Sequence, residues 1–493
     1  MYRRAKIVGT IGPASADETV LGQLLDAGLN VVRLNLSHGS HETHRKIIRS
    51  VRKLGNDKRI YVPIIVDLKG PRYRIGQLAT PLELEPGDEI FLGAEGADVQ
   101  LPVENSAILG HLRPGERVLI DNGLLELRVE AVEEDRVRTE VITGGPVSRR
   151  KGINLPDTSL PFEISEKDRR DIAFGIEEGV EYFAVSFVGG PDDLSAIRKV
   201  VELSGGVQPL ISKLERATVM RNLEATIDAS DAVMVARGDL GVEVPIHQVP
   251  VLQKKIVTIG RRLGKPVIVA TQMLESMMER PRPTRAESTD VANAVFDGAD
   301  ALMLSGETAA GSYPVETVRT MAEIILEAEA YQRDSVIPSA LGDGSQPIGE
   351  LYMPLHPGVA EREQLSLRES TEIPEMVTEA GVYAAGRLGV RHIVAFSQSG
   401  FTARMVARYR PRVPIIVFAN QLGTARRVQL VWGARPIMLE DEVRHHDEVV
   451  QVVDRTLIKH ELAEPGDIIM VMMGDPISER ALTNLIRVHR VRG

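Results

Sequence analysis

The sequence predicts an α/β protein: a (β/α)8 TIM barrel with an inserted small β-barrel lid domain and a C-terminal open α/β domain. Three observations lead to this fold. Eight short apolar runs each end in polar or charged residues, and most are followed by a stretch of helical composition, as parallel βα units require. A segment with an alternating pattern interrupts this series. A second α/β series begins beyond residue 372.

The eight apolar runs define the expected barrel strands. They are rich in Val, Ile and Leu without alternation, a pattern typical of strands that are buried on both faces. In a (β/α)8 barrel the loops at the carboxyl ends of the strands build the active site, so polar residues at those ends are candidates for chemistry. The runs end near Thr10, Asn35, Asp67, Phe187, Lys213, Ala236, Thr271 and Ser305.

The lid domain is expected at residues 74–160, between the third and fourth barrel strands. Apolar and polar positions alternate there, and the sequences PGD, RPGE and DNG mark turns. The remaining segments, residues 1–73 and 161–332, have the combined length typical of a (β/α)8 barrel. A module on the active-site rim is well placed to act as a lid that excludes water, and a passive decoration is the alternative.

A linker and a separate domain are expected after the barrel. Residues 333–372 are rich in Gly, Pro and charge, which indicates a linker. Residues 373–493 again alternate apolar runs, such as HIVAFS and VPIIVFA, with helical stretches. This pattern predicts an open α/β domain.

The composition is that of an ordinary globular protein and argues against several functions. The chain has 493 residues, 43% hydrophobic and 26% charged, with a formal net charge of -10, which argues against a nucleic-acid or anionic-membrane surface. No apolar stretch approaches the ~18 residues of a membrane span, and the start lacks a signal peptide, so a cytoplasmic location is expected. The absence of Cys excludes disulfides, thiolate catalysis and Cys-ligated metal sites.

A candidate metal and phosphate site lies at the ends of the fifth and sixth strands. Glu215 and Asp239 supply two carboxylates that suit a hard divalent cation such as Mg2+, and Lys213 faces developing anionic charge. The glycines beside Asp239, including Gly238, allow backbone N–H groups to approach an anionic ligand. A surface salt bridge is the alternative interpretation of the two acids and the lysine.

Two further strand ends carry groups that suit an anionic substrate. Thr271 closes the seventh run, where its hydroxyl and a following helix N-terminus would hold a carboxylate or phosphate; an ordinary N-cap is the alternative. After the second run, Arg33 offers a guanidinium fork for phosphate, beside Asn35, Ser37 and His38. His38 alone is weak evidence, because a single loop histidine is more often structural.

Taken together, these segments resemble the pyruvate kinase family. The resemblance covers nearly the whole chain and includes the sequences KIVGTIGPAS, RLNLSHG, SEKD, ISKLE, MVARGDLGVE, ATQMLESM and VARYRP. No Walker-A pattern is present, so ADP must be held in another way, as it is in this family. The resemblance implies transfer of the phosphoryl group of phosphoenolpyruvate to ADP, giving pyruvate and ATP.

The resemblance also assigns roles to individual residues. Lys213 would neutralise charge on the phosphoryl group and the enolate, and Arg33 would grip the phosphate. Glu215 and Asp239 would ligate Mg2+ or Mn2+. The substrate carboxylate would be seated by Gly238, Asp239 and Thr271. The nucleotide would lie between barrel and lid, against Asn35, His38, Arg74 and Lys151.

One departure from the family concerns potassium. The usual site uses the Asn and Ser of RLN-S and an Asp and Thr of DTKGPEIR. Here that second segment reads DLKGPRYRIG, so Asn35, Ser37 and Asp67 remain while Leu68 replaces the threonine. Arg72 stands where the family has glutamate, and its guanidinium would supply a fixed positive charge in place of the ion. The sequence therefore predicts activity without added K+.

A second departure follows the catalytic lysine. The family's ENxEG becomes Glu215 followed by the changed segment Arg216, Ala217, Thr218 and Val219, which keeps the metal ligand but loses the neighbouring Asn and Gly. This change predicts an altered loop geometry or altered subunit contacts, with weak catalysis or a shifted substrate as the consequence.

The C-terminal domain contains a candidate effector loop. Small hydroxyl residues and a glycine between a strand and a helix suit a phosphate, and the family's phosphorylated effectors bind at the matching loop. A plain turn with an N-cap is the alternative. A homotetramer is implied by resemblance alone. The loop consists of Ser397, Gln398, Ser399, Gly400, Phe401 and Thr402.

Two other functions stay open at the level of sequence. One is a metal-dependent lyase-type barrel that acts on an enolpyruvate or 2-oxo acid, and the other is a non-catalytic paralogue that senses phosphometabolites. The lid with Arg74 and Lys151 favours phosphotransfer, because a lyase needs no ADP site. The presence of Lys213, Glu215 and Asp239 argues against a sensor.

Overall fold

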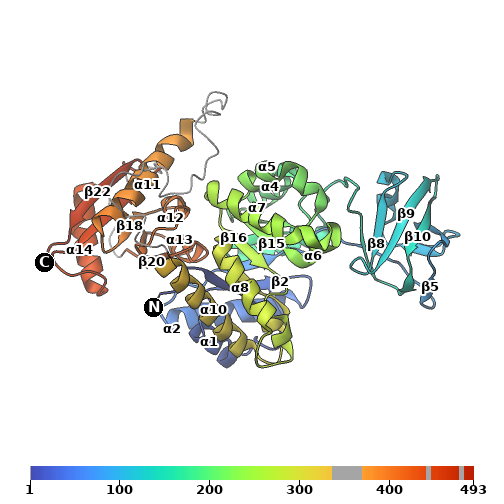
Figure 1. Cartoon of the computed structure of the whole chain (residues 1–493), viewed down its shortest axis with the longest axis horizontal. Helices are drawn as coiled ribbons and strands as arrows, with labels where there is room; N and C mark the ends of the chain where they lie inside the picture. The colour runs from blue at the N-terminus through green and yellow to red at the C-terminus, as the bar shows by residue number, and fades with distance from the viewer. Residues whose placement is uncertain (1, 336–368, 440–445, 477–481) are drawn as a thin grey trace.

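The computed structural model describes residues 2–335, 369–439, 446–476 and 482–493. Figure 1 shows three parts: a central barrel, a lid domain that projects from it, and a C-terminal domain on the opposite side. The predicted fold class is confirmed. The predicted linker lies mostly outside the described residues, and its described ends are helical, since one helix ends at Ser335 and the next begins at Glu369.

Eight parallel strands close the barrel. Their order is β1-β17-β16-β15-β14-β13-β3-β2, so each strand pairs with the one that precedes or follows it among the barrel strands. The carboxyl ends of all eight strands therefore lie at one end of the barrel, where the polar residues of the sequence collect. The strands are β1 (Lys6–Thr10), β2 (Val31–Asn35), β3 (Ile64–Asp67), β13 (Tyr182–Val185), β14 (Leu210–Leu214), β15 (Ala232–Ala236), β16 (Val267–Ala270) and β17 (Ala301–Leu304).

Helices surround the barrel and bury their apolar faces against the strands. Several begin at side-chain caps: Ser165 and Thr284 each form a capping box. The α-helices are α1 (Glu18–Asp26), α2 (His41–Asp57), α3 (Glu166–Glu177), α4 (Pro191–Leu203), α5 (Leu223–Ala229), α6 (Arg237–Glu243), α7 (Val249–Arg262), α8 (Arg285–Asp297), α9 (Gly306–Ala309) and α10 (Pro314–Ser335), and the short 3-10 helices are η2 (Ala217–Asn222), η3 (Ile246–Gln248) and η4 (Glu275–Met278).

The lid domain is a curved sheet with its own core, antiparallel apart from the parallel pair of β6 and β7. The order of its main sheet is β4-β12-β8-β9-β10-β6-β7, with β11 and β5 as a second pair. A bridge between Ile75 and Val103 joins the two edges and makes the sheet barrel-like. The elements are β4 (Tyr73–Arg74), β5 (Leu82–Leu84), β6 (Glu89–Ala94), β7 (Leu101–Val103), η1 (Ser106–His111), β8 (Arg117–Ile120), β9 (Leu125–Val132), β10 (Arg136–Thr143), β11 (Gly145–Val147) and β12 (Gly152–Asn154).

The C-terminal domain is an open five-stranded sheet in the order β20-β19-β18-β21-β22. The last strand is antiparallel and was not anticipated from the sequence. Leu430 belongs to the apolar cluster inside the barrel, and the Tyr182 hydroxyl donates to the Arg427 carbonyl at 3.0 Å, so this domain packs on the barrel. Its elements are α11 (Glu369–Leu388), β18 (Ile393–Phe396), α12 (Phe401–Ala407), β19 (Ile415–Ala419), α13 (Leu422–Val428), β20 (Ala434–Met438), α14 (His446–Lys459), β21 (Ile468–Met473) and β22 (Leu485–Arg490).

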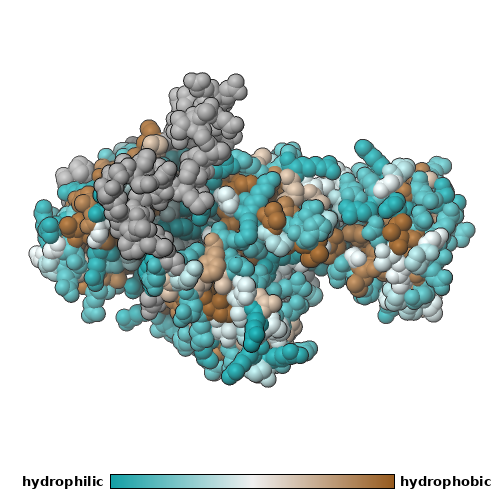
Figure 2. All heavy atoms as spheres, viewed as in Figure 1, coloured by the Kyte–Doolittle hydropathy of each residue, from teal (hydrophilic) through white to brown (hydrophobic). Residues whose placement is uncertain are grey.

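The surface matches the polar composition of the chain. Figure 2 shows a mostly hydrophilic face, with hydrophobic residues gathered where the lid joins the barrel. Among the described residues, no helix has both the length and the apolar character that crossing a membrane requires.

Candidate active site

A buried arginine is the first residue of the candidate site. Arg33 lies near the carboxyl end of β2. Its guanidinium forms an ion pair with Asp67 at the end of β3, with Nη2 2.6 Å from Oδ2. Nε donates to the same oxygen at 2.8 Å, and Nη1 donates to the Thr10 hydroxyl at 2.8 Å. Since two neighbouring strands fix the guanidinium, it is preorganised to receive an anion.

Lys213 lies on β14 and shares the carboxylate of Asp67. Its Nζ donates to the Ser186 hydroxyl at 2.8 Å and lies 3.7 Å from Asp67 Oδ1 and 3.2 Å from Glu215 Oε2. Burial alone lowers the pKa of the lysine, but Asp67, Glu215 and Asp239 outweigh that effect and raise it. Lys213 is therefore a fixed positive charge at any pH near neutrality.

Glu215 is fully buried next to this lysine. One carboxylate oxygen accepts the Phe187 amide at 2.7 Å, whereas Oε2 has no hydrogen-bond partner among the described residues. Burial raises the pKa of Glu215 to about 7; Lys213 opposes this effect and the charge of Asp239 adds to it. An oxygen that forms no hydrogen bond and lies within electrostatic reach of Asp239 suits a divalent cation as ligand.

The Asp67 carboxylate is the counterion of the cluster. Burial alone raises its pKa, but Lys213, Arg33 and Arg72 outweigh burial and lower the pKa below the ordinary value. Asp67 therefore stays ionised and holds the two basic side chains together. Its other contact is with the Ser186 hydroxyl, 3.4 Å away.

The structure places the Thr271 hydroxyl beside Gly238, as the resemblance implied, and not at the N-terminus of a helix that follows Thr271. Thr271 caps no α-helix: the next helical turn is the 3-10 helix η4, and Thr271 itself has the left-handed φ of 69°. Its hydroxyl accepts the amide of Gly238, at the start of α6, at 2.8 Å. The amides that accompany Thr271 thus come from α6, which also carries Asp239. A strained backbone that places a hydroxyl beside helix amides is typical of a ligand site.

Glu215 and Asp239 fit a divalent cation as two of its ligands. No group of three or more potential metal ligands occurs among the residues that the structure describes. A magnesium ion commonly uses one or two protein carboxylates and completes its octahedron with water and substrate phosphate oxygens. Oε2 of Glu215 forms no hydrogen bond with the described residues, and this oxygen and the electrostatic effect of Asp239 on Glu215 match that mode of binding.

A cavity of about 320 Å³ lies between the barrel and the lid. Arg74 and Lys151 line it from the lid, and Asp239 lines it from the barrel. Lys151 is paired with Asp121, with Nζ 2.5 Å from Oδ2, and Arg74 donates to the Arg150 carbonyl at 2.8 Å. The structure thus brings two of the four predicted nucleotide residues to one cavity with a predicted metal ligand. Asn35 and His38 do not line this cavity.

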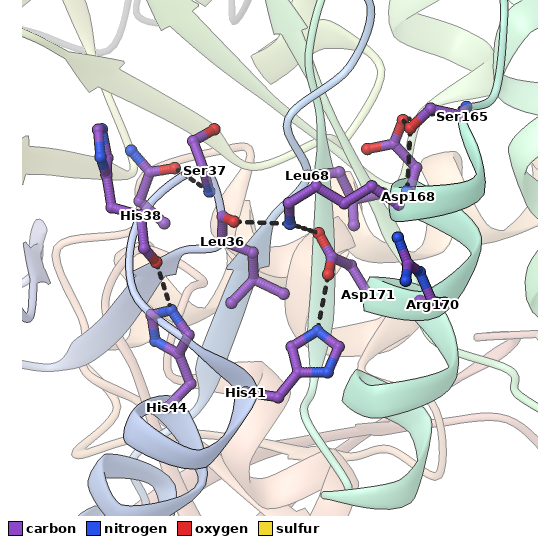
Figure 3. A network of polar contacts seen from close by, with 12 residues as sticks. Leu36, Ser37, His38, His41, His44, Leu68, Ser165, Asp168, Arg170 and Asp171 are labelled. Carbon is purple, nitrogen blue, oxygen red and sulfur yellow. Dashed lines mark hydrogen bonds and ion pairs between the residues drawn. The ribbon is translucent and has the colours of Figure 1, made fainter.

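Helix α3 holds the loops that follow β2 and β3. Lys167 Nζ donates to the Leu36 carbonyl at 2.8 Å and lies 2.5 Å from Asp171, whose other oxygen is 2.7 Å from Nε2 of His41 (Figure 3). These contacts explain the SEKD sequence, to which no role was assigned from sequence. They fix the loop that carries Asn35, Ser37 and His38.

The residues of that loop have local partners. Asn35 Oδ1 accepts the amide of Ser37 at 3.1 Å, and the carbonyl of His38 accepts from the ring of His44 at 2.8 Å (Figure 3). The next loop is held by the same helix, because the amide of Gly70 donates to Asp168 at 3.2 Å.

Arg72, the predicted substitute for potassium, acts electrostatically on Asp67. Leu68 is 2% exposed and offers no side-chain oxygen to an ion. Arg72 lines the cavity between barrel and lid, and its guanidinium carbon is 5.9 Å from the centre of the Phe187 ring. Its charge contributes to the lowered pKa of Asp67, so the arginine acts electrostatically on the site.

Sequence reasoning missed the residues that join lid and barrel. Glu243 of α6 is buried and accepts from Asn154 of the lid at 2.9 Å and from the Ala217 amide at 3.4 Å. Arg216, the first residue of the changed segment, donates to the Thr158 carbonyl at 3.2 Å. The segment therefore contacts the connection that leads from β12 back to the barrel. The only available signal was its place directly after a barrel strand.

In the candidate effector loop, serine hydroxyls of the loop itself accept hydrogen bonds from its backbone amides. The amide of Gly400 donates to the Ser397 hydroxyl at 2.9 Å, and Gly400 has the left-handed φ of 88° that favours glycine. The hydroxyls of Thr402 and Thr483 are 2.9 Å apart, and the Gln398 carbonyl accepts from Thr424 at 2.6 Å. The geometry is compatible with a capped turn as well as with a phosphate loop.

Comparison with known proteins is consistent with this arrangement. Residues 2–318 match the model of the pyruvate kinase barrel domain, and residues 375–489 match that of the pyruvate kinase alpha/beta domain. Pyruvate kinases from Sporosarcina psychrophila and Geobacillus stearothermophilus are 39% and 38% identical, with 99% of this chain and 80% of each relative covered. A crystal structure of a pyruvate kinase from Cryptosporidium parvum has a TM-score of 0.86 and 32% identity over 99% of this chain and 96% of that one. The resemblance predicted from sequence is confirmed: this chain belongs to the pyruvate kinase family and is a phosphotransferase.

Proposed function

We propose that this protein transfers the phosphoryl group of phosphoenolpyruvate to ADP, giving pyruvate and ATP, and that it does so in glycolysis. The observation that carries the proposal is the buried cluster of Arg33, Lys213, Asp67 and Glu215. Asp239 acts electrostatically on this cluster and lines the cavity between barrel and lid. Such a site can stabilise charge on a transferring phosphoryl group while the protein forms no covalent bond to it.

The two fixed cations suit the two charges that the reaction moves. Arg33 is held by Thr10 and Asp67, so its guanidinium would grip the phosphate without reorganising. Lys213 would stabilise the enolate oxygen that develops as the phosphoryl group leaves. The hydroxyl of Thr271, with the amides of Gly238 and Asp239, would receive the substrate carboxylate once the Gly238 amide releases the threonine.

A divalent cation, Mg2+ or Mn2+, is proposed at Glu215 and Asp239. When bound, it would neutralise charge on the phosphoryl and enol oxygens. Glu215 must be ionised to serve as a ligand, and its raised pKa means that a proton competes with the cation near neutral pH.

The nucleotide is proposed to lie between barrel and lid. Lys151 and Arg74 would contact its phosphates, and Asn35 and His38 would lie on the barrel side. Glu243 and Asn154 join the two parts beside this cavity, which allows the lid to exclude water from the reacting groups.

The remaining features of the proposal rest on the family. The loop from Ser397 to Thr402 is proposed to bind a phosphorylated effector, and the active assembly is proposed to be a homotetramer. A cytoplasmic location without nucleic-acid or membrane partners is consistent with the net charge of -10.

The direct test is pyruvate formation from phosphoenolpyruvate with Mg2+, measured with and without ADP. We expect stoichiometric pyruvate and ATP with ADP and no pyruvate without it. Pyruvate formation that needs no ADP would indicate a lyase or phosphatase instead. Chelation by EDTA should abolish turnover, and Mg2+ or Mn2+ should restore it.

Potassium independence is a separate prediction. The wild type should turn over at a similar rate in sodium buffer with and without K+. Arg72→Gln should lower turnover roughly 10- to 100-fold, as expected for the loss of one unit charge several ångströms from the reacting groups. Arg149→Gln, an exposed lid arginine, is the matched control and should leave turnover unchanged. A wild-type rate that rises many-fold with K+ would assign no role to Arg72 as the internal cation.

A further inference from the structure

A small cavity lies where the barrel meets the C-terminal domain, beside the amino ends of β16 and β17, whereas the phosphotransfer residues lie at the carboxyl ends of the barrel strands. Its volume is about 10 Å³, close to the space that one water molecule or one monatomic ion needs. Both domains contribute to its lining. The charged side chains that line it are Arg261, Lys265 and Asp300 from the barrel and Arg404, Arg408 and Arg410 from the C-terminal domain. Five cations therefore surround one carboxylate.

Three of these arginines bury an N–H group without an acceptor. The Nε atoms of Arg261, Arg408 and Arg410 have no hydrogen-bond partner among the described residues. Other atoms of two of them are paired: Arg410 Nη1 lies 3.0 Å from Asp300, and Arg408 Nη1 lies 2.9 Å from Glu375. Buried donors are almost always satisfied in proteins, so three around one cavity require an explanation.

The single carboxylate of the lining already accepts three hydrogen bonds. Asp300 Oδ1 accepts from Arg410 at 3.0 Å and from the Trp432 amide at 3.3 Å, and Oδ2 accepts the Val267 amide at 3.0 Å. Burial lowers the pKa of Arg261, and the neighbouring charge of Arg410 lowers it further. Outside the lining, Glu375 pairs with Arg408, and Asp228 and Asp231 act electrostatically on Lys265, so positive charge still exceeds negative charge around the cavity.

The chemistry of the lining favours an anion over water. A water molecule needs acceptors for its two protons, but the charged side chains here offer N–H donors, and both Asp300 oxygens are already engaged. A halide only accepts hydrogen bonds and also adds a negative charge to a site where basic side chains outnumber acidic ones.

We propose that this cavity binds one small monovalent anion of the chloride class, which joins the barrel to the C-terminal domain. The anion accepts the unpaired N–H groups of Arg261, Arg408 and Arg410. Since ligands come from both domains, the bound anion stabilises their present arrangement. The site is separate from the catalytic cluster and from the candidate effector loop.

The chain contains a natural reporter of this site. Trp432 is its only tryptophan, is 8% exposed, and contacts two of the residues involved. Its amide donates to Asp300, and its ring centre is 4.9 Å from the Arg410 guanidinium carbon. Bromide quenches tryptophan fluorescence, so a bromide ion bound here should quench Trp432 at concentrations where collisional quenching of a buried ring is small.

The experiment is a titration of the full-length protein with sodium bromide, at constant ionic strength maintained with gluconate. We expect saturable quenching of Trp432 that chloride reverses. Arg261→Met should remove the saturable phase, because it deletes one ligand and one charge while keeping the aliphatic stem. Arg262→Met is the matched control, since Arg262 pairs with Glu224 outside the cavity, and it should titrate like the wild type.

Thermal unfolding distinguishes loss of the site from loss of the fold. In gluconate, Arg261→Met should unfold at or above the wild-type temperature, because one of five mutually repelling charges is gone. Chloride should raise the unfolding temperature of the wild type and of Arg262→Met, but not that of Arg261→Met. Linear quenching that is equal in all three proteins, without specific stabilisation by chloride, would show that water fills the cavity and would overturn the proposal.

Discussion

Lys213→Met is expected to lower turnover by about a thousandfold, the upper range for removing one preorganised group that stabilises developing negative charge. The lysine is the fixed cation between Asp67 and Glu215, and no other described cation contacts the Glu215 carboxylate. Because the charge it opposes develops in the transition state, the loss should fall mainly on kcat and less on KM. Steady-state kinetics with phosphoenolpyruvate and ADP measures both constants.

Two controls make the result interpretable. Lys254→Met removes an exposed lysine of α7 whose partner is Asp297, and it should retain wild-type kinetics. Circular dichroism and thermal unfolding should show that Lys213→Met folds. If the folded variant keeps turnover within threefold of the wild type, Lys213 has no catalytic role. If the protein instead acts as a sensor of phosphometabolites, the variant will keep its biological effect without turnover.

Glu215→Gln is expected to abolish metal-dependent turnover while it stabilises the metal-free protein above neutral pH. Gln keeps the size of the side chain and the acceptor for the Phe187 amide, but it is a poor ligand for Mg2+. Turnover should fall by at least a thousandfold, and Mg2+ with phosphoenolpyruvate should no longer raise the unfolding temperature. Glu224→Gln, at an exposed surface pair with Arg262, serves as the control.

The stability effect follows from the sign of the pKa shift. The folded protein holds a proton on Glu215 up to a pKa of about 7, whereas the ordinary value is 4.5. The folded state therefore binds more protons between these values, and the free energy of unfolding falls as the pH rises through this window. The loss is complete above pH 7 and is at most roughly 3 kcal/mol.

A neutral amide removes this dependence on pH. Glu215→Gln and the wild type should have similar unfolding temperatures at pH 4.5, where the wild-type glutamate is protonated. At pH 8 the variant should be the more stable protein in the presence of EDTA. Equal stability at both pH values would contradict the buried, proton-binding state of Glu215.

The sequence predicted the candidate site residues that lie at the carboxyl ends of barrel strands. Lys213 and Glu215 close one barrel strand and Asp239 follows the next, so the closed parallel barrel alone brings them together. The lid was visible because its alternating pattern differs from the continuous apolar runs of the barrel. Arg33 was identifiable as a basic residue inside an apolar run.

Contacts that depend on tertiary structure were not readable. The Ser186 hydroxyl accepts a hydrogen bond from Nζ of Lys213, but only the pairing of β13 with β14 shows that the two side chains meet. From sequence, the Thr271 hydroxyl was expected to act with the N-terminus of a helix that follows it, whereas its left-handed backbone turns the hydroxyl toward α6. The hydrogen bond between Asn154 and Glu243 joins residues 89 positions apart, and no local sequence pattern predicts it.

The lid is inserted between two segments that the barrel holds firmly. The loop before it is fixed by the bond from Gly70 to Asp168, and the chain re-enters α3 at that same capping box. At the base of the lid, Arg74 pairs with Gly152 and Tyr73 with Ile153. Insertions or substitutions within the lid can therefore accumulate without displacing the site residues at the carboxyl ends of the barrel strands. In evolutionary terms, nucleotide preference can diverge between relatives while recognition of the phosphoryl donor stays unchanged.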